Sequence, residues 1–196
     1  MSAFEYIVGF HTIVLGLATA RLLETLAATV KHRGTVGHCW VHTMWVVLLQ
    51  LTIIGWWYAL WRDLRTDTVE ELGYLEFLFT LSISISWFVA AALLDPDLED
   101  HRDTDLEAQF LSVRVPLFVT FAWPGALGLI GLFVTGGEMT VTGGEMTLDR
   151  IATSAEFALL PVAGLLLRSM RGQQFLVVVH GIAFLLIEIS QQGIAG

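Results

Sequence analysis

Apolar residues are grouped into six long blocks, separated by short segments that hold most of the charged residues. A helix of about 20 apolar residues is long enough to cross a bilayer core about 30 Å thick. The lipid interior admits only helices or closed barrels, because every backbone polar group must be bonded within the protein. The pattern predicts an all-α, polytopic membrane bundle of six transmembrane helices, with spans at residues 4–26, 40–61, 72–94, 113–134, 151–167 and 175–190.

Composition agrees with a membrane protein. Of the 196 residues, 55% are hydrophobic, and the mean hydropathy is +0.69, values outside the range of ordinary soluble domains. The six spans take up most of the chain, so we expect a single transmembrane domain over residues 1–196, with short loops and no soluble domain. The lipid bilayer is then its first partner.

The charge argues against a nucleic-acid-binding site, and the cysteine content excludes an intramolecular disulfide. The net charge of −9 arises mostly from an acidic segment at residues 95–107, and it argues against nucleic-acid binding, which needs a basic face. Cys39 is the single cysteine, so no intramolecular disulfide can form.

Basic residues are distributed unequally between the two ends of the predicted spans. Seven lie in or near the segments after spans one, three and five, namely Arg21, Lys31, Arg33, Arg102, Arg114, Arg168 and Arg171. The opposite side has three, namely Arg62, Arg65 and Arg150. The positive-inside rule therefore predicts a multi-pass cell-membrane protein with cytoplasmic loops at 31–38, 95–112 and 168–174 and with both termini outside.

Small and polar residues form stripes on three of the predicted helices. They are Glu5, Gly9, Thr12, Gly16 and Thr19 on the first, Thr80, Ser82, Ser84 and Ser86 on the third, and Gly125, Gly128 and Gly131 on the fourth. Helices in lipid associate through such residues, which permit close approach or bond across helices. We expect contacts within the bundle, with further copies of the chain or with other membrane subunits; a pore lining is the alternative.

Four glutamates lie near the predicted outer ends of four different spans: Glu5, Glu76, Glu156 and Glu188. An ionisable group inside a span is costly and is by default a functional candidate. Helices that turned these acids inward would make a ring of carboxylates suited to a cation or proton path, which His11 could continue deeper into the membrane. The alternative is that each glutamate reaches the interface and only sets the depth of its helix.

The stretch HCWVH, residues 38–42, places His38 and His42 four residues apart near the inner end of the second span. Imidazoles at this spacing face the same way on a helix, as a chelating pair must. His42 and His180 could alternatively serve as haem ligands from two facing helices. Against both uses, histidines and tryptophans beside a basic loop are also typical of an ordinary membrane interface, and we expect no cofactor.

These patterns leave three functional hypotheses. The first is a membrane protein that conducts or couples a cation or proton through the outer-leaflet carboxylates. The second is a structural or accessory subunit of a larger membrane complex, and the third is a membrane redox subunit that binds haem or a transition metal. An enzyme is not favoured, because the chain lacks a nucleophile paired with a base, a phosphate-binding loop and a repeated metal motif.

Overall fold

The computed structural model describes residues 3–32, 39–66, 74–96, 105–134 and 148–193. Six α-helices make up this part of the chain, so the predicted all-α class is confirmed. The helices are α1 Ala3–Lys31, α2 Trp40–Thr66, α3 Tyr74–Leu94, α4 Leu106–Val134, α5 Leu148–Leu166 and α6 Met170–Gly193.

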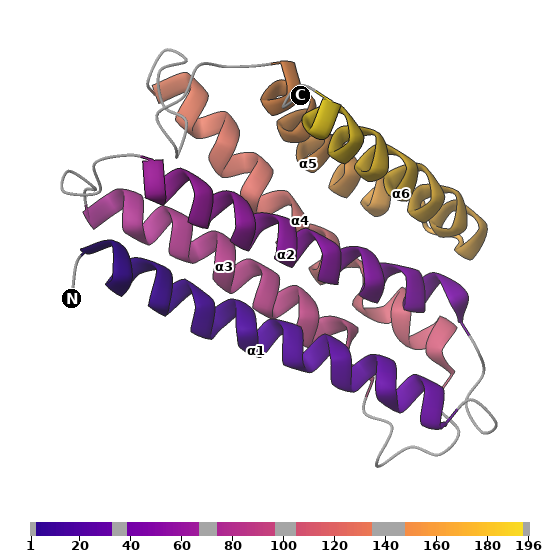
Figure 1. Cartoon of the computed structure of the whole chain (residues 1–196). Helices are drawn as coiled ribbons and strands as arrows, with labels where there is room; N and C mark the ends of the chain where they lie inside the picture. The colour runs from indigo at the N-terminus through magenta and orange to yellow at the C-terminus, as the bar shows by residue number, and fades with distance from the viewer. Residues whose placement is uncertain (1–2, 33–38, 67–73, 97–104, 135–147, 194–196) are drawn as a thin grey trace.

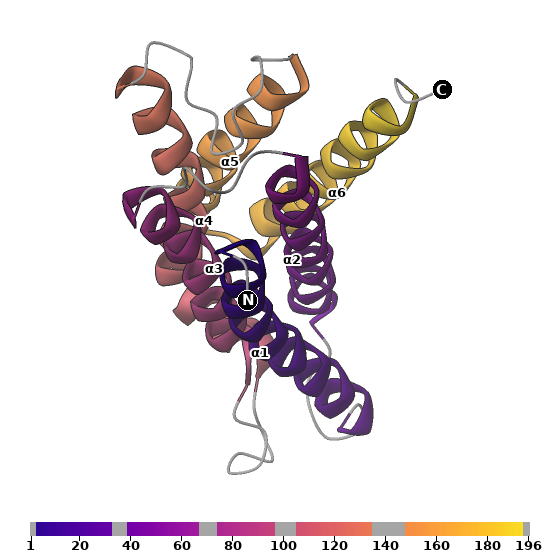
Figure 2. The same ribbon diagram turned by 60° about the vertical axis from the view of Figure 1, so that its left-hand side comes forward.

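Helices α1 to α4 form the main bundle, and helices that are not consecutive in the chain, such as α1 and α3, also pack together (Figures 1 and 2). α3 lies between α1 and α4 and packs against both, while α2 packs on α1 and also contacts α3 and α4. α5 packs along α4, and α6 contacts α5 and α2. The last two helices are therefore attached to the bundle through α4 and α2.

Four of the helices are long and apolar enough to cross a membrane, over Glu5–Lys31, Trp40–Trp61, Phe77–Leu94 and Leu106–Gly128. The described apolar parts of α5 and α6 are shorter, Phe157–Leu166 and Met170–Leu186. The chain is therefore a multi-pass membrane protein, in which four helices of the described part are of spanning length; the count of six spans stays a prediction.

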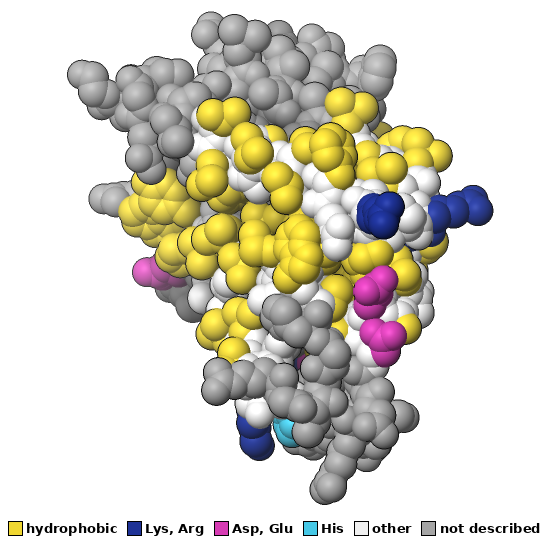
Figure 3. All heavy atoms as spheres, turned by 90° about the vertical axis from the view of Figure 1, so that its right-hand side faces the viewer, with side chains coloured by type: hydrophobic (Ala, Val, Ile, Leu, Met, Phe, Trp, Pro, Cys, Tyr) yellow, Lys and Arg dark blue, Asp and Glu magenta, His cyan; other side chains and the backbone are white. Residues whose placement is uncertain are grey.

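The outer surface of the bundle is largely hydrophobic. Ile13, Leu51, Val119 and Ile182 are each between 40% and 64% exposed, and Figure 3 shows a broad hydrophobic surface on one face of the molecule. Monomeric soluble proteins rarely expose large contiguous apolar patches. This arrangement fits helices that turn apolar side chains outward to lipid.

Two predicted loops are shorter in the structure than the sequence suggested. The loop expected at 95–112 ends before Leu106, where α4 begins, because Asp105 Oδ1 accepts hydrogen bonds from the amides of Glu107 and Ala108. Such an N-cap side chain satisfies amides that lack a partner within the helix. The loop expected at 168–174 likewise ends where α6 begins, at Met170, because hydropathy marks the apolar part of a helix and not its polar first turn.

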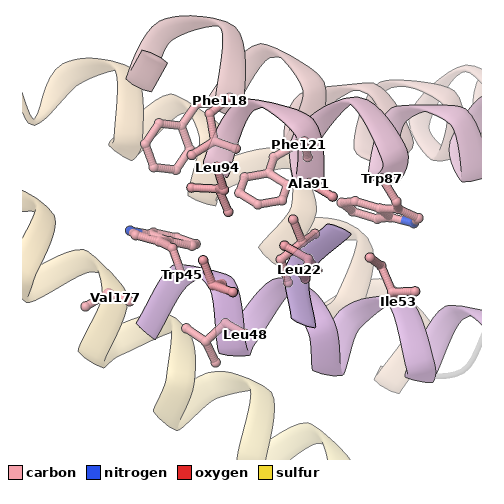
Figure 4. Close-up of a cluster of buried hydrophobic side chains, with 14 of the residues drawn as sticks. Leu22, Trp45, Leu48, Ile53, Trp87, Ala91, Leu94, Phe118, Phe121 and Val177 are labelled. Atoms are coloured by element: carbon pink, nitrogen blue, oxygen red, sulfur yellow. The ribbon is translucent and has the colours of Figure 1, made fainter. Parts of the chain in front are cut away.

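Aromatic side chains fill the centre of the bundle (Figure 4). Trp45 of α2 packs against Phe118 and Phe121 of α4, with ring centroids 5.3 and 5.7 Å apart, and Trp87 of α3 lies 5.8 Å from Phe121. Trp45 and Trp87 are almost completely buried. Offset and edge-to-face aromatic pairs contribute beyond the area that they bury, so this cluster joins α2, α3 and α4.

Tryptophan indoles also bond across helices to the hydroxyl groups of the small-polar stripes. Trp56 donates to Ser84 Oγ at 3.3 Å, Trp123 to Ser82 Oγ at 3.1 Å and Trp57 to Thr12 Oγ1 at 3.0 Å. These bonds link α2 with α3, α4 with α3 and α2 with α1. The serines and the threonine therefore serve as contacts within the bundle, one of the two uses predicted for them.

Glycines bring α4 and α5 into close contact. A Cβ added at Gly125 would lie 2.6 Å from the carbonyl oxygen of Phe157, and one added at Gly164 would lie 2.5 Å from the Phe118 ring. Neither position has room for a side chain without movement. Gly125 thus acts as the close-approach residue that the glycine stripe of the fourth helix predicts.

Candidate functional site

Of the four glutamates proposed to form a ring, only Glu5 has a described side chain. It lies in the first turn of α1 and is exposed on the surface of the bundle. Glu76, Glu156 and Glu188 belong to α3, α5 and α6, but their side chains lie outside the described residues. The carboxylate ring therefore stays a prediction.

His11 faces the interior of the bundle, on a different side of α1 from Glu5. Its ring is fully buried and lies edge-on to Phe77 of α3, with centroids 5.9 Å apart. Nδ1 donates to the carbonyl oxygen of Ile7 at 2.8 Å, and the ring also interacts with the backbone of Thr80 on α3. The structure therefore does not place His11 and Glu5 on one face.

His42 binds the end of another helix. Its Nε2 donates to the carbonyl oxygen of Leu94, the last residue of α3, at 2.7 Å. Asp95 follows directly, and its carboxylate accepts from Arg21 at 3.0 Å and from Thr25 at 3.1 Å, both on α1. Together these contacts tie α1 and α2 to the end of α3.

The carbonyls at the ends of α3 and α5 receive side-chain donors in the same way. Gln109 of α4 donates to the Asp95 carbonyl at 3.4 Å. At the end of α5, Arg114 donates to the Leu167 carbonyl at 3.1 Å, and Gln173 of α6 donates to the carbonyls of Leu167 at 2.6 Å and Gly164 at 3.1 Å. Helix ends leave carbonyls without partners inside the helix, and these side chains bond them. Neither glutamine was predicted from the sequence; their signal is an amide side chain next to an apolar run.

The remaining histidines are not assembled into a common site. His180 of α6 is buried and stacks on Trp45 of α2, with centroids 5.5 Å apart, whereas His42 is turned to α3. His38 lies outside the described residues. Among the residues that the structure describes, no group of three or more His, Cys, Asp or Glu side chains could hold a metal ion. A metal or haem site at His38, His42 and His180 stays a prediction.

An unfilled groove lies between α1 and α2 on the outer surface, with a volume of about 200 Å³. Its lining residues are Thr12, Leu15, Gly16, Thr19, Ile53, Ile54 and Trp57. The Trp57–Thr12 hydrogen bond closes one end, and a bond from Gln50 Nε2 to Thr19 Oγ1 at 3.3 Å closes the other. The two bridges are seven residues apart along α1, or about 10 Å.

Gly16 lines the α1 side of this groove, and Gly9 lies seven residues before it on α1, beyond the Trp57–Thr12 bond. A Cβ added at either glycine would meet no described atom within 4 Å. They therefore differ from Gly125 and Gly164, whose missing side chains are needed for contacts inside the chain. Two of the five residues in the predicted α1 stripe, Thr12 and Thr19, bond to α2, whereas its glycines are left open.

No known protein family, curated protein or solved structure matches this chain. The groove and the buried polar groups therefore have to be interpreted from their own geometry.

Proposed function

We propose that this protein is a subunit of a membrane complex and that the α1–α2 groove receives a transmembrane helix of another subunit. The observation that supports this proposal is the open space beside Gly9 and Gly16 on a helix of spanning length. Seven residues separate the two glycines, so they lie on almost the same face of α1, with a drift of about 20°.

The physics of association in lipid favours such a face. Lipid tails are as apolar as leucine side chains, so helices associate through close van der Waals packing and hydrogen bonds and not through the hydrophobic effect. Glycines let two backbones approach closely, and Thr12 supplies a hydroxyl between them. The aromatic packing at the centre of the described bundle supports the same role, because Trp45, Trp87 and Phe121 occupy the space where a path through one chain would run.

Substitution of Gly16 tests the proposal. Gly16→Leu would fill the groove from within, and the chain has room for the new side chain, so the fold should persist. We expect about a tenfold weaker association with the partner subunit or with a second copy, measured by co-purification in mild detergent and by the mass of the complex.

The control is Val178→Leu, which adds bulk at an exposed position of α6. It should leave the assembly unchanged. If Gly16→Leu and Val178→Leu both assemble like the original protein, or if the original protein stays monomeric and alone in both detergent and nanodiscs, the groove is not a subunit interface.

We propose as a second candidate that the protein couples or conducts a cation or proton by way of Glu5, His11, Glu76, Glu156 and Glu188. The observation that favours it is the complete burial of the His11 imidazole between α1 and α3. Ionisable groups inside spans are costly and often serve transport. In this proposal α5 and α6 cross the membrane too, giving the six spans that the sequence predicts.

Flux measurements in proteoliposomes test this second candidate. Glu76→Gln together with Glu156→Gln should lower proton or cation flux at least tenfold, and His11→Phe should do so as well. A matched control is Glu24→Gln, on the exposed inner part of α1. Unchanged flux in the variant that carries Glu76→Gln and Glu156→Gln would contradict the proposal.

A further inference from the structure

The turn between α5 and α6 presents two unpaired arginines at the end of an apolar surface. α5 ends at Leu166 and α6 begins at Met170. Arg168 and Arg171 are both exposed, and within the described part of the chain neither makes a hydrogen bond or an ion pair. They differ in this from Arg21, which is paired with Asp95.

The turn holds the two arginines in place. Ser169 accepts a hydrogen bond from the amide of Gly172 at 3.2 Å, which fixes the first turn of α6. Gly172 lies so close to Leu167 that an added Cβ would be 2.9 Å from the Leu167 Cβ. Arg114 approaches from α4 and donates to the Leu167 carbonyl. Two guanidinium groups thus belong to this short turn and a third reaches its backbone from α4, and among described residues no carboxylate lies within ion-pair distance of any of them.

An exposed apolar strip continues from Arg171 along α6. Its members recur at helical spacing and are between 49% and 68% exposed: Phe175, Val178, Ile182 and Leu185. From Arg171 to Leu185 the strip is about 21 Å long. Figure 3 shows the end of the molecule at which α6 begins. Basic side chains lie beside a hydrophobic surface there.

We propose that this surface binds an anionic phospholipid, with the headgroup phosphate held by Arg168 and Arg171 and the acyl chains lying along the α6 strip. Charge complementarity identifies the occupant: two free cations require an anion, in a chain whose net charge is −9. Guanidinium groups bind phosphate through paired, charge-assisted hydrogen bonds. The adjoining strip requires that the same anion also carry hydrocarbon, which a phospholipid does and a free phosphate does not.

Titration of the detergent-purified protein with short-chain phosphatidylglycerol tests the proposal, with bound lipid counted by native mass spectrometry. A basic residue near an anionic surface contributes enough that its loss weakens binding about fivefold. The double variant R168Q/R171Q should therefore bind phosphatidylglycerol about 25-fold more weakly. R168K/R171K keeps the charges but loses the paired geometry, so it should bind more weakly than the original protein and more tightly than R168Q/R171Q. K31Q, which removes an exposed cation at the end of α1, should stay within about threefold of the original protein.

Three results would overturn the proposal. One is equal binding of phosphatidylglycerol by the original protein and by a folded R168Q/R171Q variant. Another is equal binding of phosphatidylglycerol and phosphatidylcholine, which would show that the arginines do not select the headgroup. The third is displacement of the lipid by inorganic phosphate alone, which would indicate a site for a free anion.

Discussion

Glycine shows most clearly that one residue type serves opposite purposes in this chain. Gly125 and Gly164 lie where α4 and α5 touch, whereas a Cβ added at Gly9 or Gly16 would meet no described atom within 4 Å. The sequence predicts Gly9, Gly16 and Gly125 as helix contacts, because spacing reveals a small-residue face but not what lies opposite it. Which face is filled depends on groups from distant parts of the chain, such as the Phe157 backbone opposite Gly125.

Alanine at Gly125 should lower stability. The new Cβ would overlap the backbone of Phe157, which cannot move as a flexible side chain could, and overpacking of this kind costs about 1–3 kcal/mol. Thermal unfolding in detergent, followed by tryptophan fluorescence, measures the effect. Gly9→Ala is the matched control and should be neutral or up to about 1 kcal/mol stabilising; equal loss in both variants would contradict the α4–α5 contact.

Cys39 should be unreactive near neutral pH. It precedes α2 and is buried, and burial raises the pKa of its thiol, with the negative charges of Glu107 and Asp105 adding to the effect. Since the thiolate is the nucleophile, a raised pKa keeps the thiol protonated and slow. Alkylation by N-ethylmaleimide at pH 7 should be at least tenfold slower than in the SDS-unfolded protein. Rapid alkylation of the folded protein would mean that this site is open.

At the scale of the helices, the hydroxyl groups of α3 make different hydrogen bonds, which their spacing in the sequence does not predict. The sequence predicts Thr80, Ser82, Ser84 and Ser86 as one contact face of α3. In the structure Ser82 and Ser84 accept tryptophan N–H groups from different neighbours, while Ser86 donates only to the carbonyl of Ile83 in its own helix. Tryptophans of α2 and α4 supply these bonds, so the partner of each hydroxyl depends on how the helices are arranged, which residue spacing does not show.

Ser84→Ala should destabilise the bundle, because it removes the acceptor of the Trp56 indole. Side-chain hydrogen bonds between helices in membranes are worth about 0.6 kcal/mol on average. Reversible unfolding in mixed micelles of detergent and SDS can resolve such a difference. Ser86→Ala, on the same helix, removes no bond between helices and should change stability less; the opposite order would argue against the Trp56 contact.

At the scale of the whole molecule, the sequence predicts the number and order of helices, but their packing partners could not be predicted. The six apolar blocks of the sequence correspond to the six described helices. Long apolar runs favour helices because a helix bonds its own backbone N–H and C=O groups. The pairing of α1 with α3 and of α2 with α6 depends on side-chain fit between surfaces that are all apolar. The candidate groove escaped prediction for the same reason, since it is defined by what α1 and α2 leave unfilled.

Membrane topology can be tested by maleimide labelling of introduced cysteines, once the single native cysteine has been replaced. In a Cys39→Ser background, a membrane-impermeant maleimide applied to intact cells should label Thr66→Cys, at the end of α2, and should not label Lys31→Cys, at the end of α1. The reason is the excess of basic residues on the side that includes Lys31. Permeabilised cells should label both variants. Labelling of Lys31→Cys alone in intact cells would show that the predicted orientation is inverted.

The hydrogen bonds from Gln173 to the end of α5 have a consequence for biosynthesis. The carbonyls of Gly164 and Leu167 receive their donor from the first turn of the following helix. While a ribosome has synthesised α5 but not yet residue 173, this donor does not exist, and those carbonyls lack it. The helical hairpin of α5 and α6, and not α5 alone, is therefore the smallest unit of this region in which these carbonyls are satisfied by Gln173.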